Sequence, residues 1–176
     1  MKLIFIIIYF SFGFSNYLIE ETKSKIEYFG IHPLHSWSGS SSQILLISDC
    51  NEIETNKCDL EFHLPIMTLN SGNDNRDSNM LNYLNAYVYP KVIISFDDFL
   101  IKEYNGELLP AKININGIKK MIKIPLKVSK SKGNDYFTSS IFTILLSDFG
   151  IKLPQLFFLP INDELKIDVN LLIKGS

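Results

Sequence analysis

The sequence predicts a single all-β domain of antiparallel strands that carries one helix. Three observations support this: a hydrophobic, aromatic-rich composition, segments in which apolar and polar residues alternate, and short polar turns between those segments. Hydrophobic residues make up 46% of the 176 residues and charged residues 20%, so the chain can bury a core and fits one ordinary domain. The 13 Phe and 8 Tyr favour strands over helices.

The alternating segments are typical of strands with one buried face. They cover residues 60–66, 92–96, 122–128 and 165–173. Turn-forming residues separate the apolar segments, at Asn105-Gly106, Asn116-Gly117, Lys132-Gly133-Asn134 and Asn162-Asp163. Many strands joined by short turns predict a β-sandwich or a closed barrel.

Residues 73–86 differ from the rest, because the spacing of Met80, Leu81 and Leu84 is closer to that of a helix. Asp74 and Asp77 fall in its first turns, where carboxylates favour a helix N-terminus. We expect this helix to cap or flank the mouth of the predicted barrel.

Residues 1–15 are predicted to be a secretory signal peptide. Lys2 precedes a nearly unbroken apolar run, and Gly13 and Ser15 are small residues where a signal peptidase cleaves. An uncleaved anchor is the alternative, because weak apolar character continues to Ile19. We therefore expect a mature domain of residues 16–176, periplasmic or secreted, with no stable membrane span after cleavage.

Cys50 and Cys58 flank a polar heptapeptide between two apolar runs, which suggests a disulfide at the end of a hairpin. Closing so short a loop would stabilise the fold by about 2–3 kcal/mol. Two free thiols or half of a metal site are the alternatives. The absence of a C-x-x-C pair, with only His63 close behind, argues against zinc.

The sequence offers little chemistry for catalysis or nucleic-acid binding. A formal net charge of −2 provides no basic field for nucleic acid. His32 and His35 are three apart and would lie on opposite faces of a regular strand, although a bend at Pro33 keeps a metal pair open. No nucleophile–base set can be assembled, so we expect neither an enzyme nor a resident cofactor or metal.

The most polar segment, residues 71–77, has two interpretations. Arg76 could meet the polar or acidic head of a ligand, since a guanidinium suits planar or phosphate oxygens. Alternatively the segment is a structural elbow, in which Ser71 or Asn73 caps the helix and Arg76 pairs with Asp77 or another carboxylate. Earlier in the sequence, His35 and Trp37 are two apart and should share one face.

Several motifs together resemble a known family. They are LHSW at 34–37, LNSGNDNRDSNML at 69–81, Tyr89-Pro90 followed by VIISF, Ile113–Gly117 with Lys119, and SDFGIKLP at 147–154 followed by the turn at 161–163. In this order they are similar to the YceI-like family of small lipocalin-like barrels, often called polyisoprenoid-binding proteins. The resemblance covers most of the mature chain. It departs at Asn79, where many members carry His, and at Ala111, where the strand often begins with Gly.

The resemblance implies an extended eight-stranded antiparallel barrel with one flanking helix, which binds an amphiphilic lipid such as an isoprenoid, a quinone or a fatty-acid derivative. We predict that the ligand-binding site is lined by apolar residues of the expected strand faces and of the helix, namely Trp37, Met80, Leu84, Phe96, Ile115 and Phe142. Its polar end is predicted to meet Arg76, Asn79 and His35.

The alternative is an exported interaction protein whose barrel is filled by its own side chains. The outcome depends on how far the interior is occupied by Phe62, Phe96, Phe142, Phe157 and Phe158. The sequence also leaves open whether the barrel is a monomer or a homodimer.

Overall fold

The computed structural model describes residues 17–49 and 52–175. The predicted signal peptide, residues 1–15, lies outside this part of the chain. Cys50 lies outside it as well, so its disulfide with the buried Cys58 stays a prediction.

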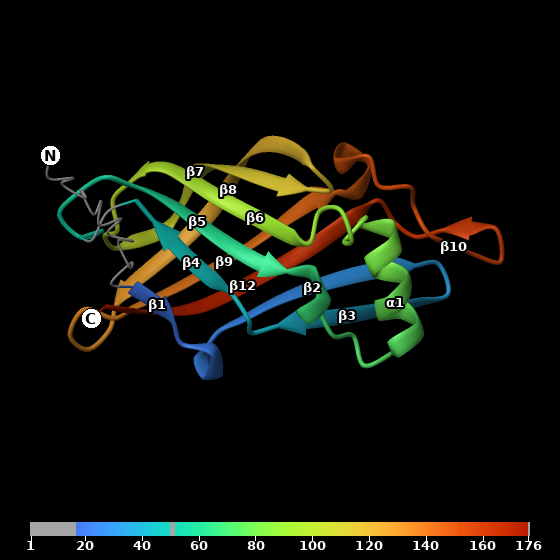
Figure 1. Cartoon of the computed structure of the whole chain (residues 1–176), viewed down its shortest axis with the longest axis horizontal. Coiled ribbons are helices and arrows are strands. Elements are labelled where there is room, and N and C mark those ends of the chain that lie inside the picture. The colour runs from blue at the N-terminus through green and yellow to red at the C-terminus, as the bar shows by residue number, and fades with distance from the viewer. Residues whose placement is uncertain (1–16, 50–51, 176) are drawn as a thin grey trace, which may run out of the picture.

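In the described residues the fold is an antiparallel sheet of ten strands with one α-helix, which confirms the predicted all-β class (Figure 1). The strand order is β3-β2-β12-β9-β8-β7-β6-β5-β4, and β1 pairs with the end of β12. Eight of these strands have seven or more residues, and the short β1 and β4 raise the number above the predicted eight. The ten strands are β1 (Tyr17–Ile19), β2 (Lys25–His32), β3 (His35–Ser41), β4 (Leu45–Ser48), β5 (Cys58–Pro65), β6 (Lys91–Phe99), β7 (Tyr104–Ile115), β8 (Ile118–Lys130), β9 (Tyr136–Leu145) and β12 (Glu164–Gly175).

The sheet curls into an elongated half-barrel (Figure 1). Its order ends at β3 on one side and at β4 on the other, and these two edges are not paired with each other in the part of the chain that the structure describes. Instead, the edge strand β3 is bridged to the segment before the helix. Ser40 and Asn70 exchange two backbone hydrogen bonds of 2.9 Å there.

Helix α1 (Asp74–Tyr83) stands across one end of the half-barrel (Figure 1). Asn73, one of the two predicted caps, begins it, because its side-chain oxygen accepts the backbone N–H of Arg76 at 3.0 Å. Met80 and Leu84 pack against the buried side chains at this end of the sheet. The apolar spacing of residues 73–86 therefore marked the correct segment, and the helix ends three residues earlier.

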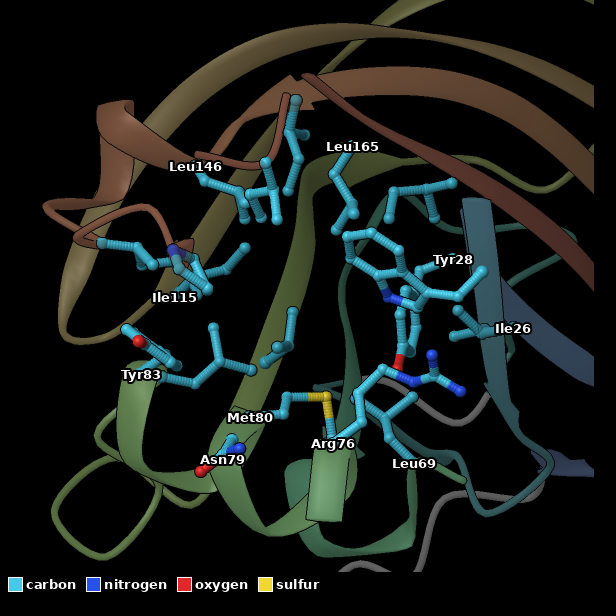
Figure 2. A pocket seen from close by; sticks show the side chains of 18 of the residues that line it. Ile26, Tyr28, Leu69, Arg76, Asn79, Met80, Tyr83, Ile115, Leu146 and Leu165 are labelled. Carbon is cyan, nitrogen blue, oxygen red and sulfur yellow. The ribbon is translucent and has the colours of Figure 1, made fainter. Parts of the chain in front are cut away.

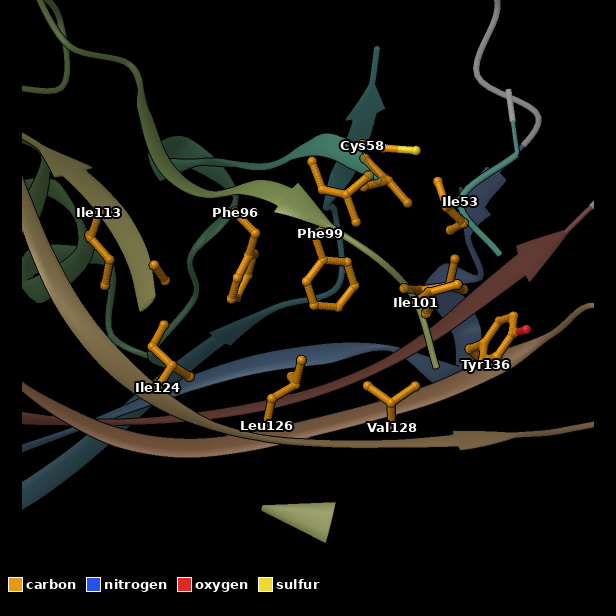
Figure 3. Close-up of a cluster of buried hydrophobic side chains, with 14 of the residues drawn as sticks. Ile53, Cys58, Phe96, Phe99, Ile101, Ile113, Ile124, Leu126, Val128 and Tyr136 are labelled. Carbon is orange, nitrogen blue, oxygen red and sulfur yellow. The ribbon is translucent and has the colours of Figure 1, made fainter. Parts of the chain in front are cut away.

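The opposite end of the half-barrel is filled by buried side chains (Figure 3). Phe96 contacts Phe99 with ring centroids 5.3 Å apart, and Phe99 stacks on Tyr104 at 5.7 Å. The pKa of Tyr136 is raised to about 12, first by burial and then by a hydrogen bond with Glu54 and by the negative charge of Glu54. Other members of this cluster include Ile53, Cys58, Leu60, Ile101 and Val128.

The predicted turns had different outcomes. Asn116-Gly117 joins β7 to β8, with positive φ values of 52° and 75°. Asn105-Gly106 was predicted as a turn and instead lies inside β7, where the register with β8 shifts. Gly106 has φ 92°, so it forms a bulge, and a bulge requires the same left-handed conformation from glycine as a turn.

A small hairpin follows β9, formed by β10 (Gln155–Leu156) and β11 (Leu159–Pro160). Its two-residue turn is Phe157-Phe158, and both side chains are exposed to solvent. The alternative interpretation included these two residues among those that could fill the barrel, and the structure shows that they do not.

Candidate functional site: a cavity beneath the helix

A cavity of about 520 Å³ lies between helix α1 and the inner face of the sheet (Figure 2). This volume falls within the range of small-molecule sites, roughly 300–1,000 Å³. The larger cavity thus lies at the end of the half-barrel beneath the helix, whereas the other end holds buried side chains and only a small second cavity.

The walls of the cavity are almost entirely apolar. Most of the wall consists of side chains that point inward from the sheet. Because every second residue of a strand points to the same face, the alternation of apolar and polar residues in the sequence produces this surface. The aliphatic and phenylalanine side chains that the main sheet contributes are Ile26, Phe62, Leu64, Val92, Ile94, Ile113, Ile115, Phe142, Ile144, Leu165 and Ile167.

Two aromatic rings enter the cavity because each lies over a glycine of the neighbouring strand. Gly30 pairs with Trp37, and Tyr28 pairs with Gly39, across β2 and β3. A Cβ at Gly30 would lie 2.4 Å from the Trp37 ring, and a Cβ at Gly39 would lie 2.5 Å from the Tyr28 hydroxyl. The two aromatic-x-Gly runs, Tyr28–Gly30 and Trp37–Gly39, are the sequence signal that would have identified Tyr28 as a lining residue.

The polar end of the cavity is organised around Ser71. The Asp77 carboxylate accepts the Ser71 hydroxyl at 2.5 Å and its backbone N–H at 3.1 Å. Arg76 Nε donates to Ser71 Oγ at 2.8 Å, and Nη2 donates to Ser71 O at 3.3 Å. The guanidinium lies 6.0 Å from the centroid of the Trp37 ring. This network holds the guanidinium of Arg76 beside the apolar side chains of the cavity, where Figure 2 shows it.

The structural-elbow interpretation holds for Asn73, which caps the helix, and in part for Arg76, which is hydrogen-bonded within the elbow to Ser71 and not to a carboxylate. Within the described residues, Arg76 forms no ion pair with Asp77 or with another carboxylate, because Ser71 lies between the two charged groups. The positive charge of Arg76 is thus held in place by a neutral hydroxyl, and it can meet an anionic group at the cavity.

Tyr28 adds a second donor near this end. Burial raises the pKa of Tyr28, and the negative charge of Asp77 raises it further, while the charge of Arg76 and a hydrogen bond with Ser71 oppose the shift. The phenol therefore keeps its proton at neutral pH.

The predicted placement of the histidines was wrong. HPLH forms the β2–β3 turn, so His32 and His35 are cross-strand partners with ring centroids 5.5 Å apart, and they do not lie on opposite faces. His35 contacts Trp37 at 5.7 Å, as their shared face predicted. His32 Nδ1 accepts the Leu34 N–H at 3.2 Å, which leaves Nε2 to donate to Leu159 O at 3.1 Å.

Both ring nitrogens of His32 are therefore engaged by the protein. Among residues 17–49 and 52–175, no three His, Cys, Asp or Glu side chains gather in a way that could hold a metal ion.

Eight of the nine residues predicted to contact the ligand line the cavity. They are Trp37, Met80, Leu84, Ile115, Phe142, Arg76, Asn79 and His35. Phe96 lies deeper, against a second cavity of about 50 Å³. The role of all nine in binding stays a prediction.

The two cavities share part of their walls. Ile26, Phe62, Ile94 and Phe142 line both of them. Phe62 also contacts Phe96 edge to face, with ring centroids 6.3 Å apart. The phenyl rings of Phe62 and Phe142 therefore form the bulkiest part of the floor that ends the larger cavity.

No helix in the described residues is both long and apolar enough to span a membrane. No curated protein matches the sequence. Solved structures with the same fold include BcnA of Burkholderia cenocepacia, 13% identical with a TM-score of 0.71, over 89% of this chain and 99% of that one.

A polyisoprenoid binding domain from Saccharophagus degradans is 14% identical, with a TM-score of 0.72, over 93% of this chain and 100% of that one. A YceI protein of Campylobacter jejuni is 14% identical, with a TM-score of 0.56, over 100% and 93%. The family model of the YceI-like domain matches residues 17–173, nearly all of the described chain. The chain therefore belongs to the YceI-like family.

Proposed function

We propose that this protein is an exported, non-enzymatic carrier that holds one amphiphilic lipid, an isoprenoid, a quinone or a fatty-acid derivative, in the cavity beneath α1. The observation that carries the proposal is an apolar cavity of about 520 Å³ with a cation and hydroxyl donors at one end. A buried apolar tail gains roughly 0.8 kcal/mol per methylene before the costs of association are subtracted. The polyisoprenoid-binding relative supports a lipid as the ligand.

The head of the ligand is assigned to the end where Arg76 and Tyr28 both reach Ser71, while His35 lies on the other side of the Trp37 ring. Arg76 supplies charge without an opposing carboxylate bound to it, and Tyr28 supplies a phenol that remains protonated. Asn79, at the position where many relatives carry His, lines the same cavity and offers an amide in place of an imidazole. An anionic or strongly hydrogen-bonding head group fits this set.

The filled-barrel alternative describes only the far half of the interior. Phe96, Phe99 and Tyr104 close that half, whereas the half beneath the helix stays open. This division favours a short or folded apolar tail over one that runs through the whole length of the half-barrel.

Export remains part of the proposal and rests on residues 1–15 and the cysteine pair in the sequence. A protein that meets amphiphiles outside the cytoplasm would keep their tails from water, which is what an apolar cavity under a helix does.

The direct test is native mass spectrometry of protein purified from its own source, followed by organic extraction. We expect one lipid per chain. Val92→Phe, which adds a ring inside the cavity, should lower the bound fraction, whereas Ile141→Phe on the exposed face of β9 should not. Protein that is free of lipid and also fails to bind hydrophobic dyes would contradict the proposal.

A further inference from the structure

The β10–β11 hairpin projects from the cavity end of the molecule (Figure 1). Its turn consists of Phe157 and Phe158, which are 75% and 95% exposed. Leu156 and Leu159, which pair next to the turn, are each 43% exposed. Four consecutive large apolar side chains thus face solvent at a single tip.

Local structure does not account for these residues. Phe157 and Phe158 have φ values of 50° and 65°, so both occupy the left-handed region that Asn and Gly adopt most readily in two-residue hairpin turns. Core packing does not account for them either, because both side chains are largely exposed. A pair of phenylalanines at this turn costs backbone strain and leaves apolar surface in water, which indicates a role outside the folded monomer.

The hairpin is tied to the mouth of the cavity. His32 Nε2 donates to Leu159 O at 3.1 Å, and Asn162 N donates to Ile31 O at 2.8 Å. Gln155 and Leu156 line the cavity itself. The exposed tip is therefore continuous with the cavity wall and held at a fixed position beside it.

The charge pattern and the exposed area point to a lipid surface as the partner. Residues 153–161 contain no charged side chain, and the residue before them is Lys152. The two phenyl side chains offer on the order of 300–500 Å². Even with the exposed parts of Leu156 and Leu159, the tip stays below the roughly 800 Å² per partner of a stable protein interface. Apolar side chains at a tip can instead enter the boundary between head groups and acyl chains, which requires no matching protein surface.

We propose that the tip formed by Leu156–Leu159 inserts into the surface of a lipid bilayer and holds the cavity mouth at the membrane. The insertion does not depend on which lipid the cavity holds. Because the run carries only one neighbouring lysine, it is driven by apolar contact and not by anionic lipid.

The sharpest variant is Phe157→Asn with Phe158→Gly. Asn-Gly is the favoured sequence for this turn, so the hairpin should be kept or stabilised while both rings are removed. The control is Leu108→Gln with Met121→Gln, which removes two side chains of 62% and 61% exposure from the outer wall of β7 and β8.

The measurement is flotation of the purified protein with phosphatidylcholine vesicles, with and without phosphatidylglycerol. We expect the unmodified protein and the control to bind both vesicle types, and the Asn-Gly variant to bind at least tenfold more weakly. All three should take up a soluble fluorescent fatty acid equally, which separates this proposal from that of the carrier.

Three results would overturn the proposal: failure of the unmodified protein to bind either vesicle, equal binding by the Asn-Gly variant, or binding only when phosphatidylglycerol is present. Loss of self-association in the Asn-Gly variant, with no vesicle binding by the unmodified protein, would assign the tip to a protein partner instead.

Discussion

Replacing Phe62 with alanine should lengthen the apolar tail that the protein can hold. Phe62 lies on β5, lines both cavities, and packs edge to face on Phe96. Without its ring, the cavity of about 520 Å³ gains the space of the phenyl group and access to the smaller one of about 50 Å³. We expect a loss of stability near the lower end of the roughly 3–5 kcal/mol typical of Phe→Ala, because the ring already borders empty space.

The assay is displacement of a fluorescent fatty acid by a series of saturated fatty acids of increasing length. While added methylenes still enter the cavity, each contributes about 0.8 kcal/mol, which is roughly fourfold in Kd. The unmodified protein should show this slope up to a break point and a plateau beyond it. Phe62→Ala should move the break point by at least two carbons, so that acids just beyond it bind roughly fifteenfold more tightly than before.

Phe137→Ala is the matched control, because this side chain is 46% exposed on β9 and lies outside the cavity. If the alanine variant fails to fold, Phe62→Leu should still shift the break point in the same direction. An identical break point in the unmodified protein and both Phe62 variants would refute the assignment of this ring as the floor of the cavity.

Three further predictions follow from the site and the core. Gly30→Ala should displace the Trp37 ring, because the added Cβ would lie 2.4 Å from it. Tryptophan emission should therefore change and ligand affinity should fall, whereas the control Ser38→Ala should change neither. Arg76→Gln should weaken binding of a fatty acid about tenfold or more, from the loss of hydrogen bonds to a charged group, and should leave binding of the matching fatty alcohol nearly unchanged; equal losses for both would contradict the assigned head-group end. The raised pKa of Tyr136, about 12, stabilises the fold below pH 10, and this contribution is lost as the pH rises toward 12. Urea unfolding at pH 9 and pH 11 should therefore show a fall of at most about 1.4 kcal/mol, because only the pH unit from 10 to 11 lies within the window in which this contribution is lost. Tyr136→Phe should lose less than the unmodified protein.

Patterns of short range predicted the helix and four of the strands, β5, β6, β8 and β12. Alternation over 122–128 and 165–173 corresponds to β8 and β12, because side chains of a strand point to opposite faces in turn. Helical spacing near Met80 and the acidic first turn located α1. The inward faces of these elements then placed most of the predicted lining residues at one cavity.

Features that depend on where the chain turns and on which end of the half-barrel a side chain enters could not be predicted. Phe96 was assigned to the ligand, but Phe99 and Tyr104 stack behind it and make it part of the filled end. Phe157 and Phe158 are not residues that favour turns, so the residue types at these positions did not predict the two-residue turn that they form. His32 and His35 face each other because Pro33-Leu34 turns the chain, which a regular-strand rule does not allow for.

Because Trp37 is the only tryptophan of the chain and lines the cavity, its fluorescence reports directly on occupancy. The most direct test of the carrier is therefore a titration of lipid-free protein with a long-chain amphiphile, followed by Trp37 emission. We predict a saturable change that ends at one molecule per chain and that is weakened by Val92→Phe inside the cavity. No change up to the solubility limit of the amphiphile, or an equal response in Val92→Phe, would contradict a lipid held beneath the helix.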